Sequence, residues 1–228
     1  MANLQAAEKL PVRAVQRAFD LLALLGTQSE SSTLSGLARD SGLPVSTVAR
    51  LLATLEHSAL VRRDPGGRYG PGTRLMQIGL ASLRGFSVYD MAEPHLRRLS
   101  ESSGETANLA VRADTGHAIY LRQVVSPRSI HHASWLGRTL SLRKTAIGAA
   151  LLGNVEPNGY VARRNTLEPG VTAIAAPVYG PAGEIIAAFS ITGPSFRITE
   201  RDVARFGARV VKAARVASAE LGAPPPRR

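Results

Sequence analysis

The sequence predicts an α+β protein built from two parts with different patterns. Residues 10–72 show three amphipathic helices followed by a β-hairpin, and residues 87–222 alternate helices with half-buried strands. A further amphipathic helix over 73–86 links the two parts, with the boundary near Gly85. The proline-rich end, residues 223–228, is expected to be a disordered tail.

The first two helices follow from apolar spacing and from stop signals. The first helix ends near Gly26, and the second runs from about Ser35, a good N-cap, to Gly42. The apolar face expected to pack inward on the first helix consists of Val12, Val15, Ala18, Phe19, Leu22 and Leu25.

The third helix has the clearest division into two faces. It begins near Pro44, because proline at the first helical position costs nothing. One face is an apolar stripe at helical spacing, and the opposite face carries Ser46, Thr47, Arg50, Ala53 and Thr54. Two β-like segments, 60–64 and 68–70, then flank a Pro-Gly-Gly turn.

This order of elements is typical of a winged helix-turn-helix, whose third helix enters the major groove of DNA. Short hydroxyl side chains approach the duplex closely, and arginine can grip guanine with two hydrogen bonds. The alternative is a surface helix whose polar residues are simply solvated. The residues expected to contact DNA are Ser35, Pro44, Ser46, Thr47, Arg50, Thr54, Arg62, Arg63 and Arg68.

Composition limits the other function classes. The formal net charge is +11, which favours polyanionic partners, and the basic residues are spread over both parts. The chain has no cysteine, so disulfides, thiolate nucleophiles and cysteine metal sites are excluded. No signal peptide, membrane span, metal-ligand spacing, nucleophile elbow or phosphate loop is evident. We therefore expect a cytoplasmic protein that is not an enzyme and needs no cofactor or metal.

The second part predicts a single sensor-like α/β domain. Its last helix has the clearest start, because Thr199 and Asp202 resemble a capping box, and it reaches Leu221. The other elements expected are helices over 90–102 and 145–152 and strands over 105–112, 116–125, 171–179 and 184–192.

The segment GLPVSTVARLLATLEHSALVRRDPGGRYGPG resembles the DNA-binding motif of the IclR family of bacterial transcriptional regulators. Gly-Leu-Pro, Ser-Thr, Arg-Leu-Leu and Thr-Leu-Glu recur in that order in the family. The second part is similar to the family in SGETANLAV, TAIGAALLG, LEPGVTAIAAPV and SITGPSFRIT. The resemblance covers nearly the whole chain, from about Val12 to Gly222.

The resemblance implies a repressor-type regulator that binds a palindromic DNA operator as a homodimer or homotetramer. It also implies a GAF-like or profilin-like second domain that senses a small organic or aromatic acid. Trp135 is a possible apolar wall of that site, although a core role is at least as plausible for it. Besides Trp135, the residues that the resemblance places at the effector site are Ala146, Ile147, Gly148, Arg163, Ala173, Ser190 and Thr192.

Three departures from the family pattern bear on this expectation. Arg143 and Lys144 add two cations near the mouth of the site, and Arg163 replaces a position that is acidic in some relatives. The segment 153–159 is much shorter than in the family, where a helical excursion is usual. The alternative function is therefore a ligand-independent DNA-binding regulator whose second domain serves only oligomerisation.

Overall fold

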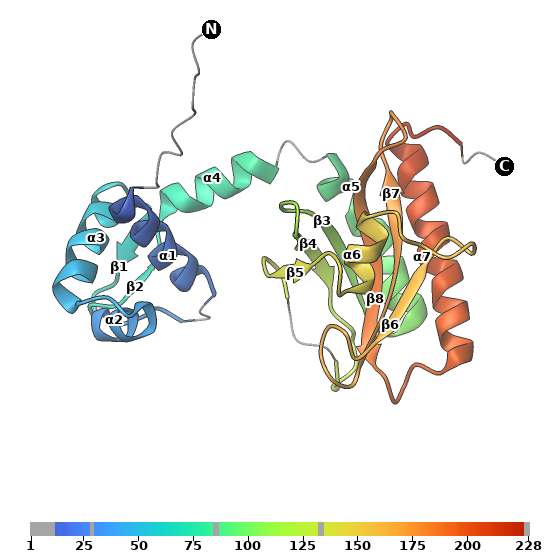
Figure 1. Ribbon diagram of the computed structural model, residues 1–228, viewed down its shortest axis with the longest axis horizontal. Coiled ribbons are helices and arrows are strands. Elements are labelled where there is room, and N and C mark those ends of the chain that lie inside the picture. The colour runs from blue at the N-terminus through green and yellow to red at the C-terminus, as the bar shows by residue number, and fades with distance from the viewer. Residues whose placement is uncertain (1–11, 28–29, 84–86, 132–134, 226–228) are drawn as a thin grey trace, which may run out of the picture. The chain divides into compact units, whose positions relative to one another are not determined.

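The structure is a computed structural model that describes residues 12–27, 30–83, 87–131 and 135–225. The chain divides into two compact units, Met1–Gly85 and Phe86–Arg228 (Figure 1). Both contain helices and strands, so the predicted α+β class is confirmed. The outer ends of the predicted module and tail, 10–11 and 226–228, and the end of the predicted linker helix, 84–86, lie outside the described residues.

The first unit contains helices and a short hairpin in the predicted order. Its core gathers apolar side chains from all three leading helices and from the hairpin, including Leu21, Leu37, Leu52 and Val61. The elements are α1 Arg13–Thr27, α2 Leu34–Ser41, α3 Val45–His57, β1 Val61–Arg63, β2 Tyr69–Pro71 and α4 Thr73–Leu83.

The expected inward face of α1 was wrong in part. Leu21 and Leu25 are buried, whereas the side chains of Val12, Val15 and Phe19 are 67%, 49% and 59% exposed. The helix carries two overlapping apolar faces, and the small core of this unit has room for only one of them. Periodicity alone cannot tell which face packs inside the same unit.

The start of α2 also differs from expectation by two residues. Thr33, not Ser35, is the N-cap, and its hydroxyl accepts a hydrogen bond from the amide of Gly36 at 3.1 Å. Thr and Ser are both good N-cap residues, so the sequence alone does not show which of the two starts the helix. The helix ends at Gly42, whose φ of 68° makes the tight turn into α3 possible without side-chain strain.

The helix α4 contains no buried residue. Three of its large apolar side chains, Met76, Ile78 and Leu80, are more than half exposed. Helices in water are stabilised mainly by packing of an apolar face, so this helix lacks that support within its own unit.

The second unit is a six-stranded antiparallel sheet with helices on both faces. Its strand order is β5-β4-β3-β8-β7-β6, and the longest pairing joins β7 to β8. Two of the strands, β5 and β6, were not predicted because they contain only three and four residues. The strands are β3 Thr106–Arg112, β4 His117–Val124, β5 Thr139–Ser141, β6 Val161–Arg164, β7 Val171–Tyr179 and β8 Ile185–Pro194.

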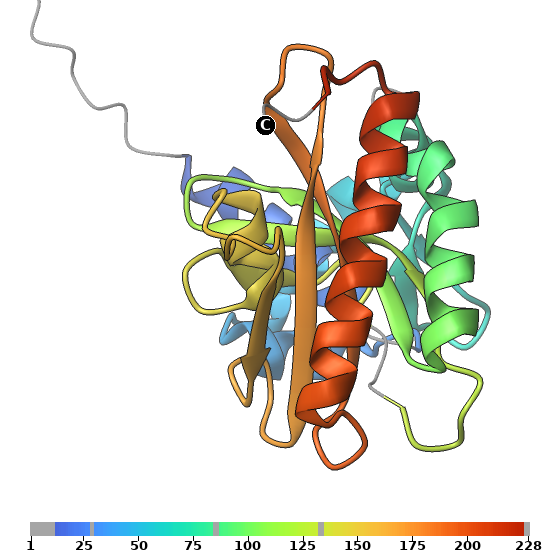
Figure 2. The same ribbon diagram turned by 90° about the vertical axis from the view of Figure 1, so that its right-hand side faces the viewer.

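The helices α5 (Ser87–Ser103) and α7 (Glu200–Glu220) lie side by side on one face of the sheet, as Figure 2 shows. They cover an apolar layer that includes Leu96, Phe189 and Val210. The predicted capping box of α7 is confirmed, because Thr199 and Asp202 each accept a hydrogen bond from the other's amide.

The short helix α6 (Ala146–Leu151) lies against the other face of the sheet, with all six residues buried. The strands beneath it present small side chains such as Ala110, Ala175 and Ala188, so the helix can approach closely. Gly148 allows a second close contact, with the segment before α6, because a Cβ there would lie 2.3 Å from the carbonyl oxygen of Leu142.

A buried ion cluster fixes two loops at the end of β3. Glu105 is 2% exposed and accepts two hydrogen bonds from Arg197, at 2.7 and 2.8 Å, and one from Arg128 at 3.1 Å. These bonds raise the pKa of Arg197. Arg197 also donates to the carbonyl of Ile130, so the loop after β4 and the loop before α7 are both tied to this carboxylate.

We predict that Glu105→Ala destabilises the second unit by about 3–5 kcal/mol, because it leaves a partly buried guanidinium without its partner. Trp135 is the only tryptophan and lies in this unit, so its fluorescence in urea reports the transition. The exposed Glu101→Ala is the matched control and is expected to leave the midpoint nearly unchanged. Equal midpoints for the two variants would contradict the prediction.

Candidate functional sites

The polar face of α3 is open to solvent in the first unit. Val48, Leu52 and Leu55 are buried, and the predicted residues Ser46, Arg50 and Thr54 lie on the exposed side. Thr47 is partly buried. The guanidinium of Arg50 makes no hydrogen bond or ion pair with the described residues. Its five donors are therefore available to an external partner.

The start of α3 is also available to an external partner. Pro44 is the N-cap and not the first helical residue, and it provides no side-chain cap. Its carbonyl accepts bonds from the amides of Thr47 and Val48. The backbone amides of Val45 and Ser46, at the start of the helix, therefore have no side-chain cap. Free amides at a helix N-terminus are well placed to bind a phosphate.

The hairpin presents three arginines, of which two lie against their own unit. Arg63 lies over the ring of Tyr69 at 5.5 Å, and the Nε of Arg68 donates to the carbonyl of Ser31 at 2.9 Å. Arg62 has no such partner among the described residues. The hairpin therefore combines one unattached and two positioned guanidinium groups.

Asp64 shapes the turn between these arginines. Its carboxylate accepts a bond from the amide of Arg68 at 2.9 Å and another from the hydroxyl of Ser31 at 3.1 Å. The hydrogen bond from the Arg68 amide, more than any other contact, lowers the pKa of Asp64. The turn thus keeps its only acidic group bonded inward and away from a polyanion.

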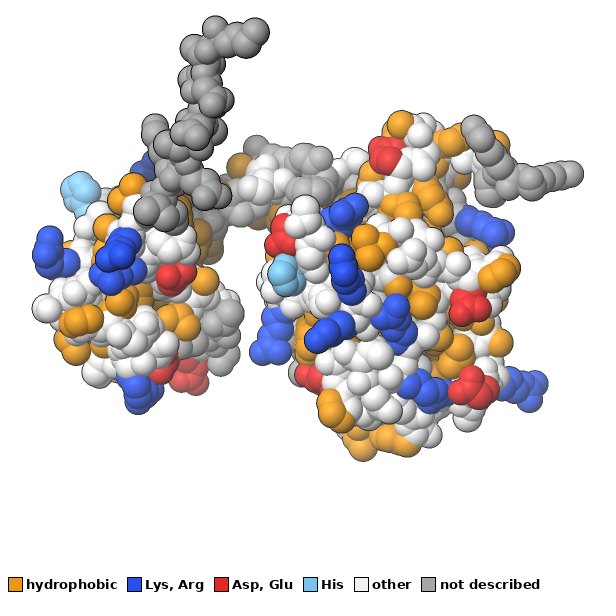
Figure 3. All heavy atoms as spheres, in the orientation of Figure 1, with side chains coloured by type: hydrophobic (Ala, Val, Ile, Leu, Met, Phe, Trp, Pro, Cys, Tyr) orange, Lys and Arg blue, Asp and Glu red, His pale blue; other side chains and the backbone are white. Residues whose placement is uncertain are grey.

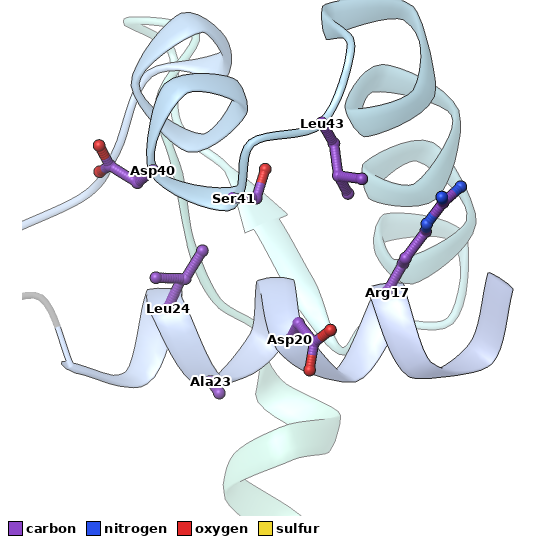
Figure 4. Close-up of a pocket in the computed structure, with 7 residues that line it drawn as sticks. All are labelled: Arg17, Asp20, Ala23, Leu24, Asp40, Ser41 and Leu43. Atoms are coloured by element: carbon purple, nitrogen blue, oxygen red, sulfur yellow. The ribbon is translucent and has the colours of Figure 1, made fainter. Parts of the chain in front are cut away.

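A groove of about 420 Å³ lies elsewhere on this unit, between α1 and the end of α2. Figure 4 shows its lining, which comprises Arg17, Asp20, Ala23, Leu24, Asp40, Ser41 and Leu43. The carboxylates of Asp20 and Asp40 would repel phosphate. The groove is thus less suited to a nucleic acid backbone than the polar face of α3, where Arg50 is exposed between the uncharged residues Ser46 and Thr54.

In the second unit, two of the predicted effector residues belong to a buried polar cluster. Ser190 and Thr192 face the same side of β8, as predicted. The side-chain amide Nδ2 of Asn108 donates to both hydroxyls, at 3.3 and 3.2 Å. Gln123 donates to Asn108 at 2.7 Å, but its own Oε1 is buried without a partner among the described residues. Burial raises the pKa of Tyr120, whose hydroxyl bonds Ser190.

The remaining predicted effector residues surround this cluster and α6. Ala173 and Trp135 both pack in the apolar layer beneath α6, and Arg138 lies over the Trp135 ring at 5.4 Å. Arg163 donates to the carbonyl of Arg143 at 2.7 Å. The two cations of the predicted mouth, Arg143 and Lys144, are exposed.

One predicted contact requires correction. The amide of Gly148 already donates to the hydroxyl of Thr145, the N-cap of α6, at 3.1 Å. It is therefore not a free donor, because the capping side chain that starts the helix uses it. The amides of Ala146 and Ile147 donate no hydrogen bond to the described residues, although both residues are buried.

Asn108, Gln123 and Tyr120 were missed as site residues. The local sequence of β3 and β4 does not distinguish these three residues from core or surface positions. Asn108 is the register partner of both Gln123 and Ser190 across neighbouring strands. These side chains meet because β3 lies between β4 and β8, and this strand order could not be predicted from the sequence.

No group of three or more metal-ligating side chains occurs in the described ranges. Within the same residues, no helix is both long and apolar enough to cross a bilayer. Figure 3 shows basic side chains scattered over both units, with no single acidic or basic face in that view.

Comparison with known proteins identifies relatives of both units. The IclR helix-turn-helix domain model matches residues 14–65, and the model of the C-terminal region of bacterial IclR transcriptional regulators matches 80–158 and 150–219. The transcriptional repressor IclR of Escherichia coli K12 is 28% identical over 92% of this chain and 90% of its own length. The regulator BhcR of Paracoccus denitrificans is 30% identical over 90% and 85%.

Solved structures share the fold. The IclR protein of Thermotoga maritima covers 92% of this chain and 99% of its own at a TM-score of 0.73 and 24% identity. An IclR homologue of Microbacterium hydrocarbonoxydans, complexed with 4-hydroxybenzoate, covers 91% and 98% at a TM-score of 0.73 and 21% identity. The named sequence relatives are transcriptional regulators and not enzymes, in agreement with the sequence prediction.

Proposed function

Because the chain belongs to the IclR family of bacterial transcriptional regulators, we propose that it is a repressor that binds a palindromic operator as a homodimer or a dimer of dimers. Its operator affinity would change when the second unit binds a small organic acid. As a DNA-binding regulator, it would act in the cytoplasm, where bacterial DNA lies.

The observation that carries the DNA-binding proposal is the exposed polar face of α3, on which the Arg50 guanidinium has no partner among the described residues. Arg50 and the neighbouring hydroxyls are exposed, and the first turn of the helix lacks a side-chain cap. In the groove, Arg50 would read a base edge, while Ser46, Thr47 and Thr54 would bond to phosphate or base atoms. Arg62, Arg63 and Arg68 would hold the backbone beside it. Ser35, exposed in the first turn of α2, and Pro44 would lie near the phosphates.

Exposed apolar residues in the first unit support the dimer. Val15 and Phe19 on α1, and Ile78 and Leu80 on α4, are about half exposed or more. Isolated exposed apolar residues are common, but two helices with such faces favour a partner surface. A second copy supplies the same surface and would fix the spacing of the two operator half-sites.

The buried polar cluster supports effector binding. Gln123 has a buried acceptor without a partner in the described part of the chain, and buried acceptors are rarely left unsatisfied. A ligand hydroxyl would donate to this acceptor. The side chains of Ser190, Thr192 and Asn108 would form hydrogen bonds with other polar groups of the ligand. Ala173 and Trp135 would form apolar walls, and Arg163, with Arg143 and Lys144 near the mouth, would favour an anionic ligand.

A second candidate is a ligand-independent regulator, with the second unit serving only oligomerisation. It is favoured by the hydrogen bonds that Ser190 and Thr192 already make to Asn108 and by the use of the Gly148 amide within α6. The short α6–β6 connection adds to this case. The choice between the two functions depends on whether any small acid changes operator affinity.

We predict that Arg50→Ala weakens operator binding by about 1–3 kcal/mol while leaving binding to random DNA nearly unchanged, because it removes base recognition. Arg62→Ala should weaken both kinds of binding and reduce the salt dependence, because it removes a phosphate contact. Fluorescence anisotropy at several salt concentrations measures both effects. An unchanged ratio of specific to random affinity in Arg50→Ala would refute the placement of α3.

We predict that Phe19→Glu combined with Leu80→Glu shifts the protein toward the monomer, because two charges would be buried in the proposed interface. Light scattering at fixed protein concentration measures the mass. Thr115→Glu, at an exposed turn in the second unit, is the control. If the double variant keeps the wild-type mass, these faces do not form the interface.

We predict that Asn108→Leu removes any effect of organic acids on operator affinity while operator affinity without ligand stays near the wild-type value. Titration with 4-hydroxybenzoate and related acids, followed by anisotropy, tests this. Ser87→Ala, at an exposed position at the start of α5, serves as the control. If no acid changes wild-type operator affinity, the ligand-independent function is favoured instead.

A further inference from the structure

A groove of about 550 Å³ lies in the second unit between β7, the C-terminal half of α7 and the connection from α6 to β6. Its walls include Val155, Ala176, Pro177 and Val211. The volume is within the usual range for small-molecule sites. It is distinct from the polar cluster on the α6 side of the sheet, because Ala176 and Val211 pack in the layer under α5 and α7.

The groove is open because β6 is short. The pairing of β6 with β7 covers Thr172 to Ala175, so the end of β7 from Ala176 onward has no partner strand on that edge. The connection from α6 turns at Gly159, where φ is 86°, and leads directly into β6. The chain therefore returns to the sheet without covering the end of β7.

The match to the family model is interrupted at the same point. The model of the C-terminal region matches in two pieces, 80–158 and 150–219, which overlap at residues 150–158. The groove lies beside this segment, because Val155 is one of its lining residues.

The groove has one charged residue, Arg215, among its described lining residues. Arg215 is exposed and forms no hydrogen bond or ion pair with the part of the chain that the structure describes. On the outer side, the chain after α7 turns back, with the amide of Ala223 donating to the carbonyl of Ser218 at 2.9 Å. Pro224 then forms part of the wall.

We propose that this groove is a second ligand site that binds a small organic anion with an apolar body. The anionic group would pair with Arg215, and the body would lie against Ala176, Pro177 and Val211. A second copy of the chain is a poorer occupant. A twofold contact through this surface would bring two Arg215 side chains near each other with no acidic lining residue between them.

The test uses the full-length protein and the fluorescent probe 8-anilinonaphthalene-1-sulfonate, which has an apolar body and one sulfonate. Arg215→Ala removes the proposed cation, and Lys212→Ala removes another exposed cation of α7 outside the groove. Ala219→Trp fills the groove from an exposed position, and Ala208→Trp is the matched control on the same helix.

The expected result is that Arg215→Ala weakens probe binding about tenfold or more. Ala219→Trp is expected to abolish the same binding event, while both controls stay close to wild type. Benzoate should displace the probe in the wild-type protein. An unchanged circular dichroism spectrum and an unchanged urea midpoint in all four variants would show that the second unit folds, since all four substitutions lie in α7.

Three results would overturn the proposal. One is probe binding that is insensitive to both Arg215→Ala and Ala219→Trp. Another is an equal loss in Lys212→Ala, which would indicate general charge attraction. The third is a changed molecular mass in Ala219→Trp without a change in probe binding, which would make the groove an interface between copies.

Discussion

The packing of one side of α3 is the constraint on which the function depends. Val48, Leu52 and Leu55 are held by the core of the first unit, so the opposite side of the helix must face solvent. Burying three apolar side chains of this size contributes several kcal/mol, roughly 1.5–3 kcal/mol for each. No other orientation of α3 would keep that contribution, and this orientation leaves Arg50 available to a partner.

The sequence predicted this part of the protein well because the signals are local. An apolar stripe, a glycine turn and a Pro-Gly-Gly hairpin each act over a few residues, and α3, β1 and β2 follow them closely. The inward face of α1 was harder, because Phe19 and Leu21 are both apolar and only tertiary contacts decide which is buried. The proposed dimer gives the exposed face a physical reason that helical periodicity could not provide.

In the second unit, prediction failed where distant residues meet. Strands of three or four residues carry too little pattern to be recognised, so β5 and β6 were absent from the expectation. The polar cluster depends on β3 lying between β4 and β8, which no local signal encodes. The family resemblance identified Ser190 and Thr192 but not Asn108, which bonds to both of them.

The short connection between α6 and β6 is also a place where the second unit can accept inserted residues. It joins a buried helix to an edge strand, and residues such as Asn154 and Pro157 in it are exposed. The entropic cost of lengthening a surface loop rises only slowly with the number of residues added. We therefore expect a short peptide inserted at these exposed residues to cost the sheet little stability.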